Sequence, residues 1–243
     1  MTLIKNLFFS YFGFLSNSYN RDQWVIKELR SIKKGQNILD AGAGECRYKK
    51  YCDHLKYISQ DFCEYDGKGN NKGLQTKNRD HSKIKIVSDI TTIPLKNSSI
   101  DNILCTEVLE HLPRPELAIK EFHRLLKKGG KLILTAPFAS LTHYSPYHYI
   151  TGFNIYWYKK ILKENGFKIT KIRANGNYFD YINQELLRIP YVIKKYSNIL
   201  VMVLILILYM LILPLVLILN FFRKTKHLNE LANFGYFISM LKT

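Results

Sequence analysis

The chain has 243 residues, enough for one ordinary domain and an appendage, and its 47% hydrophobic and 14% aromatic content excludes a disordered or fibrous chain. Lysine and arginine number 36 against 19 aspartates and glutamates, so the formal net charge is +17. This charge indicates an anionic partner, such as nucleic acid, an acidic lipid surface or a phosphorylated substrate, without choosing among them. The four cysteines form no C-x-x-C pair and no signal peptide is visible, so we expect a reducing compartment.

The elements predicted along the chain alternate between helix and strand. Residues 1–21 hold a broken apolar run and are predicted to be an interfacial or docking segment. A helix over Asp22–Ile32 opens the main domain, which we place at residues 22–175. Further helices are expected at 115–126 and 154–165, and strands at 37–41, 56–60, 83–87, 100–105, 131–136 and 167–173. This order predicts a doubly wound α/β fold with a parallel sheet covered on both faces.

A polar, glycine-rich stretch over residues 64–82 interrupts this alternation. It is predicted to be a surface loop that replaces or shortens one crossover helix.

The segment ILDAGAGECR, residues 38–47, carries the sharpest chemical signal. The predicted strand runs into Asp40, and Gly42 and Gly44 then allow the backbone to approach a ligand closely as it turns toward a helix. The third glycine of a nicotinamide-type G-x-G-x-x-G would fall on Arg47, so that reading fails. A carboxylate at the strand tip favours a cationic or hydroxyl-bearing ligand over a phosphate.

Two more acids follow later strands. Asp61 lies 21 residues after Asp40, where doubly wound folds place an acid that accepts hydrogen bonds from ribose hydroxyls. Asp89 and Ile90 end the segment VSDI, and the run NSSIDNILCTEVLEHL comes next. Together these motifs resemble the class I S-adenosylmethionine-dependent methyltransferases, in the small-molecule group whose pattern is D-x-G-x-G, acid, D-x-x-x-L-P, S-x-D, E-V-L-E-H, G-G. The resemblance covers roughly residues 22–175.

This resemblance implies a Rossmann-like, seven-stranded sheet and S-adenosyl-L-methionine as cofactor. It implies that Asp40, Gly42 and Gly44 hold the methionine part, Asp61 the ribose, Phe62 one side of the adenine, and Asp89 and Ile90 its edge. The chain departs from the pattern at Cys46, where the family often has a third glycine, and at Ile93, where leucine usually precedes the proline.

The loop HYSPYHY, residues 143–149, supplies His143 and His148 as candidate bases because imidazole titrates near neutral pH. It resembles the H-x-x-P-x-x-Y stretch of methyltransferases of surface-polysaccharide biosynthesis. The alternative is an aromatic lid that packs without catalysing.

The string Glu107-x-x-Glu110-His111, with His143 later, resembles a metal-assisted subset of the family that includes small-RNA 2′-O-methyltransferases and some quinone O-methyltransferases. A divalent metal is therefore possible, but we favour a site without one. In that reading Glu107 orders the loop under the cofactor and His111 packs against the helix.

Residues 199–219 contain no charge. As a helix they would extend roughly 32 Å at about 1.5 Å per residue, which matches a bilayer core of about 30 Å. We therefore predict an apolar, membrane-associated insertion at residues 176–233 that spans, re-enters or lies on the membrane. The resemblance requires a last, antiparallel strand, which we place at Phe234–Lys242, so the C-terminus and the catalytic domain are expected on the cytoplasmic side. The alternative is a buried dimerisation helix in a soluble protein.

The function predicted from these features is O-methylation of a membrane-resident or lipid-linked acceptor, either a glycan or a quinone-like lipid. An RNA methyltransferase is one alternative, but no RNA-binding module is visible. A membrane-bound scaffold that binds the cofactor without turnover is the other. The oligomeric state stays open.

Overall fold

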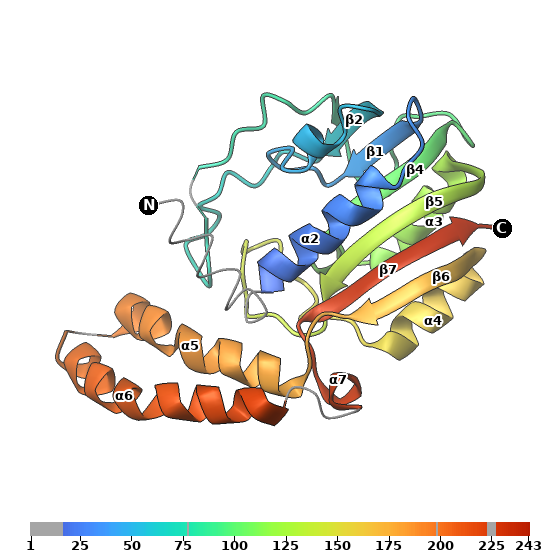
Figure 1. Ribbon diagram of the computed structural model, residues 1–243. Coiled ribbons are helices and arrows are strands. Elements are labelled where there is room, and N and C mark those ends of the chain that lie inside the picture. Colours follow the sequence, from blue (N-terminus) through green and yellow to red (C-terminus); the bar gives the residue numbers. More distant parts are fainter. Residues whose placement is uncertain (1–16, 77, 198, 223–226) are drawn as a thin grey trace. The chain divides into compact units, whose positions relative to one another are not determined.

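The computed structural model describes residues 17–76, 78–197, 199–222 and 227–243, apart from the side chains of 199, 202–206, 209, 213 and 220 (Figure 1). Contacts divide the chain into two units. The catalytic unit is Arg21–Arg173 with Gly235–Thr243, and the helical unit is Ala174–Phe234 with the chain up to Asn20. The domain boundaries predicted at 21, 175 and 233 stay predictions.

Seven strands form one sheet in the order β3-β2-β1-β4-β5-β7-β6. Strands β1 to β5 pair in parallel, and β7 runs antiparallel to β5, with Lys131 opposite Leu241 and Pro137 opposite Gly235. The predicted doubly wound sheet with a returning last strand is therefore confirmed. The strands are β1 Asn37–Ala41, β2 Lys56–Asp61, β3 Ile86–Val87, β4 Ile100–Thr106, β5 Leu126–Pro137, β6 Phe167–Ala174 and β7 Gly235–Lys242.

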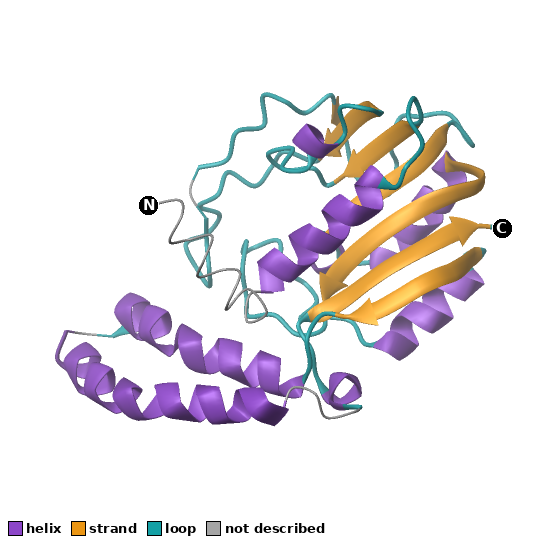
Figure 2. Ribbon diagram, viewed as in Figure 1, coloured by secondary structure: helices purple, strands orange, loops and turns teal. Residues whose placement is uncertain are grey.

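Helices cover both faces of this sheet. Figure 2 shows α2 (Asn17–Arg30) in front of it and α3 (Pro115–Leu125) and α4 (Ile155–Glu164) behind it. Helix α3 begins at a proline, whose missing N–H costs nothing in the first turn, and buries Ala118, Ile119, Phe122 and Leu125 at helical spacing. Two short 3₁₀ turns, η2 (Lys49–Tyr51) and η3 (Leu109–His111), follow β1 and β4.

The first helix runs over Asn17–Arg30 rather than the predicted Asp22–Ile32, and two strands also differ clearly from their predicted bounds. The third strand is only Ile86–Val87, because its partner β2 offers it just Gln60 and Asp61. The fifth strand begins at Leu126 rather than Lys131, because Leu126 pairs with Ile100 and the Lys-Lys-Gly-Gly run lies inside the strand as an irregularity in the register.

Helices α5 (Tyr178–Tyr196), α6 (Ile199–Phe221) and α7 (Leu228–Leu231) lie between β6 and β7 in the chain. Asn177 and Asp180 form a reciprocal capping box at the start of α5. Helices α5 and α6 pack together: the Asn183 amide donates to the Val216 carbonyl (3.4 Å), and the Phe179 and Phe222 rings lie 5.6 Å apart. The predicted insertion is thus helical.

Over the residues that can be described, none of the helices combines the length and apolar character needed to cross a bilayer. The prediction left open whether residues 199–219 span, re-enter or lie on the membrane, and the described residues give no support to the spanning alternative. The predicted docking segment up to residue 16 and the cations at 223, 224 and 226 lie outside the described residues.

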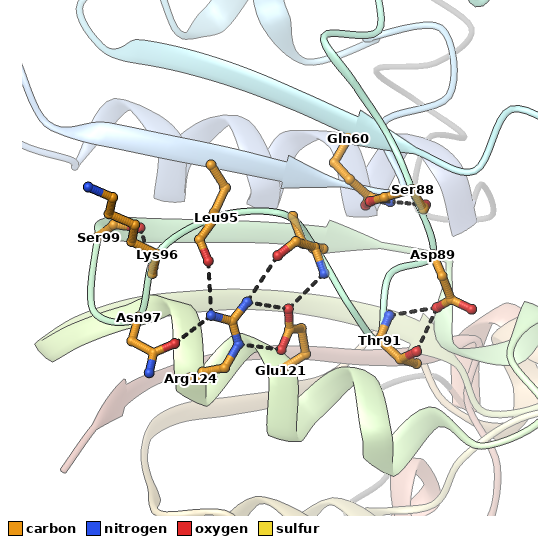
Figure 3. A network of polar contacts seen from close by, with 11 residues as sticks. Gln60, Ser88, Asp89, Thr91, Leu95, Lys96, Asn97, Ser99, Glu121 and Arg124 are labelled. Atoms are coloured by element: carbon orange, nitrogen blue, oxygen red, sulfur yellow. Dashed lines mark hydrogen bonds and ion pairs between the residues drawn. The ribbon is translucent and has the colours of Figure 1, made fainter.

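An ion pair between the buried Glu121 and the partly exposed Arg124 holds the loop that follows β3 against α3 (Figure 3). Glu121 accepts from the Ile93 amide at 2.7 Å and pairs with Arg124 at 2.6 Å. Arg124 in turn donates to the carbonyls of Ile93 and Leu95. One carboxylate thus supports the loop that carries Asp89 and Ile90.

We expect Glu121→Gln to lower the free energy of unfolding by about 2–3 kcal/mol, because it leaves a guanidinium and a buried amide without a charged acceptor. Urea denaturation measures this loss. The control is Glu164→Gln, which removes an exposed pair with Lys160 and should change stability by less than about 0.5 kcal/mol. Equal stability of the two variants would contradict the anchoring role of Glu121.

Candidate active site

The loops after β1, β2, β4 and β5 meet at the carboxyl edge of the sheet, where open α/β sheets bind ligands. Each of these loops holds at least one non-glycine residue in the left-handed region of backbone space. Such a conformation is costly and persists only where surrounding contacts enforce it, as at functional sites. The residues, with φ of 52° to 60°, are Cys46, Cys63, Asn71, Glu107 and Tyr144.

The loop after β1 is bonded to β2 through its backbone. Gly42 and Ala43 donate to the Gln60 carbonyl at 2.9 Å, and the Gly44 amide donates to the Asp61 carboxylate at 2.8 Å. Gly42 has φ +73°, and a Cβ there would collide with the Val108 side chain. Glycine at this position therefore lets the backbone approach the Val108 side chain closely, whereas the predicted close approach to a ligand stays a prediction.

Asp40 is buried at the end of β1, 2% exposed, and accepts a hydrogen bond of 2.6 Å from the Tyr57 hydroxyl. Burial raises the pKa of Asp40 to about 7, the nearby Asp61 charge adds to the rise, and the Tyr57 bond opposes it. A cationic ligand beside this carboxyl would restore its ionised form.

Two backbone amides hold the Asp61 carboxylate in place. One oxygen accepts from the Gly44 amide, and the other accepts from the Cys63 amide at 2.9 Å. Phe62 is 38% exposed, and its ring meets the edge of Tyr147 at 5.1 Å between centroids. An aromatic face and an acid thus stand side by side at the end of β2.

The remaining predicted cofactor residues follow β3. Asp89 is exposed and accepts from the amide and hydroxyl of Thr91, both at 2.7 Å, whereas Ile90 is buried. The Gln60 amide donates to the Ser88 carbonyl at 2.7 Å and ties this segment to β2 (Figure 3). The structure thus gathers Asp40, Gly42, Gly44 and Asp61 directly and places Asp89 and Ile90 beside the neighbouring strand.

The two candidate bases lie in the loop after β5, with their ring centroids 4.7 Å apart. His143 Nδ1 lies 2.8 Å from the Leu141 carbonyl, which can only accept, so Nδ1 carries the hydrogen, and in the neutral ring Nε2 has the lone pair. His148 Nε2 lies 3.1 Å from Ser140 Oγ. Because Ser140 Oγ donates to the Thr151 carbonyl, it accepts from His148.

Glu110 and His111 lie beneath this loop. His111 Nδ1 donates to the Tyr147 carbonyl at 2.5 Å, so its Nε2 also carries a lone pair. Nε2 of His111 and of His143 lie 3.8 and 4.0 Å from the same Glu110 oxygen. Burial, then the Glu107 charge, raises the pKa of Glu110 far above its usual range, and burial with His143 lowers the pKa of His111 to about 3.

Donor atoms of Glu110, His111 and His143 all lie within 4.8 Å of one another and could hold a divalent ion. Glu107, grouped with them by sequence spacing, points elsewhere: it pairs with Arg21 at 2.7 Å and accepts from Thr135 at 2.9 Å. The spacing argument for Glu107 as a ligand is therefore wrong, and its role in ordering the loop fits the structure.

Sequence reasoning missed two partners of this site. Tyr57 reaches Asp40 from the neighbouring strand, and Arg21 reaches Glu107 from α2. No local pattern marks either residue, because both pairings depend on the packing of elements distant in the sequence.

The sheet order, the glycine turn after β1 and the acid after β2 together define the fold of class I S-adenosylmethionine-dependent methyltransferases. Residues 39–134 match the family model described as a methyltransferase domain. The match covers less than half of the chain, and over these residues the chain is similar to methyltransferases.

Curated relatives match only segments of the chain. A ubiquinone biosynthesis O-methyltransferase of Xanthomonas oryzae pv. oryzae is 36% identical over 63 residues, which is 26% of this chain and 26% of that protein. An uncharacterized 37.1 kDa protein in transposon TN4556 of Streptomyces fradiae is 39% identical over 51 residues, 21% of this chain and 15% of that protein. The matched segments thus span about a quarter or less of these relatives.

Solved structures resemble nearly the whole chain. Phosphoethanolamine N-methyltransferase 2 of Haemonchus contortus, in complex with S-adenosyl-L-methionine, has a TM-score of 0.52 at 17% identity, over 92% of this chain and 52% of that one. The 4+2 cyclase SpnF has a TM-score of 0.52 at 15% identity, over 92% and 81%. Because a cyclase shares the fold, the fold alone does not fix the reaction.

Proposed function

We propose that the chain transfers a methyl group from S-adenosyl-L-methionine to a hydroxyl of a membrane-resident or lipid-linked acceptor, a glycan or a quinone-like lipid. When bound, the cofactor supplies an electrophilic methyl group on a sulfonium. Asp40, Gly42, Gly44 and Asp61 would hold it, with Phe62, Asp89 and Ile90 on the adenine side. One observation carries the proposal: two histidines lie over the same sheet edge as the buried Asp40 and the glycine turn.

Methyl transfer to a hydroxyl requires that the oxygen approach the methyl group in a suitable geometry and that a nearby group accept the proton. His143 Nε2 has a lone pair, and His148 is oriented by Ser140, so either ring could receive the acceptor's hydroxyl proton as the oxygen attacks. The matched segment of a ubiquinone biosynthesis O-methyltransferase supports an oxygen atom as the nucleophile.

Support for a lipid-associated acceptor comes from the helical unit. Helix α6 exposes large apolar side chains, with Leu200, Met210 and Phe221 at 77%, 74% and 84% exposure, and exposed apolar area of this kind marks interaction surfaces. Lys194 and Lys195 at the end of α5 would favour an anionic lipid surface. The catalytic unit would then face the cytoplasm, where the cofactor is made.

Incubation with methyl-labelled cofactor and fractionated membrane lipids tests the proposal. We expect label in the lipid fraction, and flotation of the protein with anionic vesicles even when competitor RNA is added. Label in RNA with no flotation would favour the RNA methyltransferase instead. Cofactor binding without transfer to any fraction would favour a scaffold.

A further inference from the structure

The glycine-rich segment 64–82 is bound to the loop that carries the candidate bases. The Asn70 amide donates to the Ser145 carbonyl (3.1 Å), the Leu74 amide to the Thr142 carbonyl (2.9 Å), and the Tyr144 amide to the Leu74 carbonyl (3.0 Å). A Cβ at Gly69 or Gly73 would collide with a carbonyl of that loop. What the sequence predicted as a plain surface loop therefore brings its own side chains to the site.

Segment 64–82 places one cationic side chain, Arg79, at the candidate site. Its guanidinium carbon lies 4.4 Å from the Tyr144 ring centre and 5.2 Å from that of Tyr65. Its Nη1 lies 3.2 Å from the point where a Cβ on Gly44 would be, so it also borders the glycine turn. Arg79 thus stands between the predicted cofactor loop and the loop of the two histidines.

Arg79 differs from the comparable arginines of the catalytic unit. Arg21, Arg79 and Arg124 are its three arginines that are not exposed. Arg21 pairs with Glu107 and Arg124 with Glu121, whereas no carboxylate in the described part of the chain pairs with Arg79. A partly buried guanidinium stays charged, and two aromatic rings satisfy its faces but not its N–H groups.

We propose that Arg79 binds an oxyanion, a carboxylate or a phosphate, of a ligand at the junction of the two loops. The guanidinium fork matches both groups in a bidentate geometry. The proposal rests on the proposed function for its two sources: the amino-acid carboxylate of the cofactor, or a phosphate on the acceptor.

Calorimetry on the full chain separates these sources without requiring turnover. The probes are S-adenosylhomocysteine, 5′-methylthioadenosine, which lacks the amino-acid part, and inorganic phosphate added to the nucleoside-bound protein. The variants are Arg79→Gln and Arg79→Lys. The control is Arg30→Gln, which removes an exposed charge from α2.

If the cofactor supplies the anion, Arg79→Gln weakens the binding of S-adenosylhomocysteine by about tenfold or more and leaves the binding of 5′-methylthioadenosine unchanged. If the acceptor supplies it, only phosphate binding is lost. Arg79→Lys keeps a positive charge beside the aromatic rings but loses the guanidinium fork, so its affinity for the affected probe should lie between those of wild type and Arg79→Gln. The lysine variant keeps the test valid if the glutamine variant unfolds. Unchanged binding of all three probes in both variants overturns the proposal, whereas failure of every protein to bind either nucleoside would instead contradict the proposed function.

Discussion

Asp40→Asn is expected to weaken the binding of S-adenosyl-L-methionine by about ten- to a hundredfold at pH 8, because a buried charge-assisted contact is lost while the side-chain volume stays the same. Asp61→Ala should cause a loss of similar size, since its carboxylate accepts from the Gly44 amide and is predicted to hold the ribose. Calorimetry measures both losses. The control is Asp53→Asn, an exposed aspartate in the same unit. Wild-type affinity in both variants would contradict this site assignment.

The pKa of about 7 at Asp40 gives this prediction a pH signature. A cationic ligand needs the ionised carboxyl, so wild-type affinity should rise as the pH rises from about 6 to 8 and then level off. Asp40→Asn has no group to ionise, and its affinity should stay flat across the same interval.

The free energy of unfolding of the ligand-free protein should fall over the pH range in which the affinity rises. Because the folded-state pKa of Asp40 lies above its unfolded value of 3.8, the group favours the folded state fully at low pH. That contribution is lost as the pH rises through about 7, by an amount on the order of 4 kcal/mol. Asp40→Asn should therefore have a higher free energy of unfolding than wild type at pH 8 without ligand. A wild-type affinity that falls between pH 6 and 8 would contradict the ionised role of Asp40.

The sheet could be predicted because its signals are local. Strand length, the glycine turn and the acids at strand ends each depend on a few neighbouring residues, and they fixed Asn37–Ala41 to the residue. The Asp40–Tyr57 bond could not be predicted, because it depends on the register in which β2 pairs with β1. The same applies to Glu107: its spacing from Glu110 favours a shared site, but Arg21 on α2 draws it away.

The segment 64–82 shows a different limit of sequence reasoning. Its polar, glycine-rich composition correctly predicts a loop, since the described residues of this segment form no helix or strand. Composition does not reveal that its backbone pairs with residues 142–145, nearly seventy positions later. Gly69 and Gly73 allow the backbone of this segment to approach the carbonyls of Ser145 and Thr142 closely.

Replacing the histidines after β5 should have the largest effect on turnover. We expect at least one of His143→Ala and His148→Ala to lower turnover on the true acceptor by about 10²–10⁴-fold, the range typical of a positioned base. Cofactor affinity should stay within about twofold of wild type, because the predicted cofactor residues lie in and after β1, β2 and β3, whereas both histidines lie in the loop after β5. Single-turnover kinetics with labelled cofactor, paired with calorimetry, separates the two quantities.

Three comparisons sharpen this prediction. His227→Ala removes an exposed histidine of the helical unit and serves as the matched control. Ser140→Ala releases His148 from its 3.1 Å contact, and should lower turnover only if His148 is the base. Turnover that vanishes with a chelator and returns with a divalent ion would instead assign His143, with Glu110 and His111, to a metal. Full turnover in both histidine variants would mean that the acceptor loses its proton to another group, and would remove this loop from the chemistry.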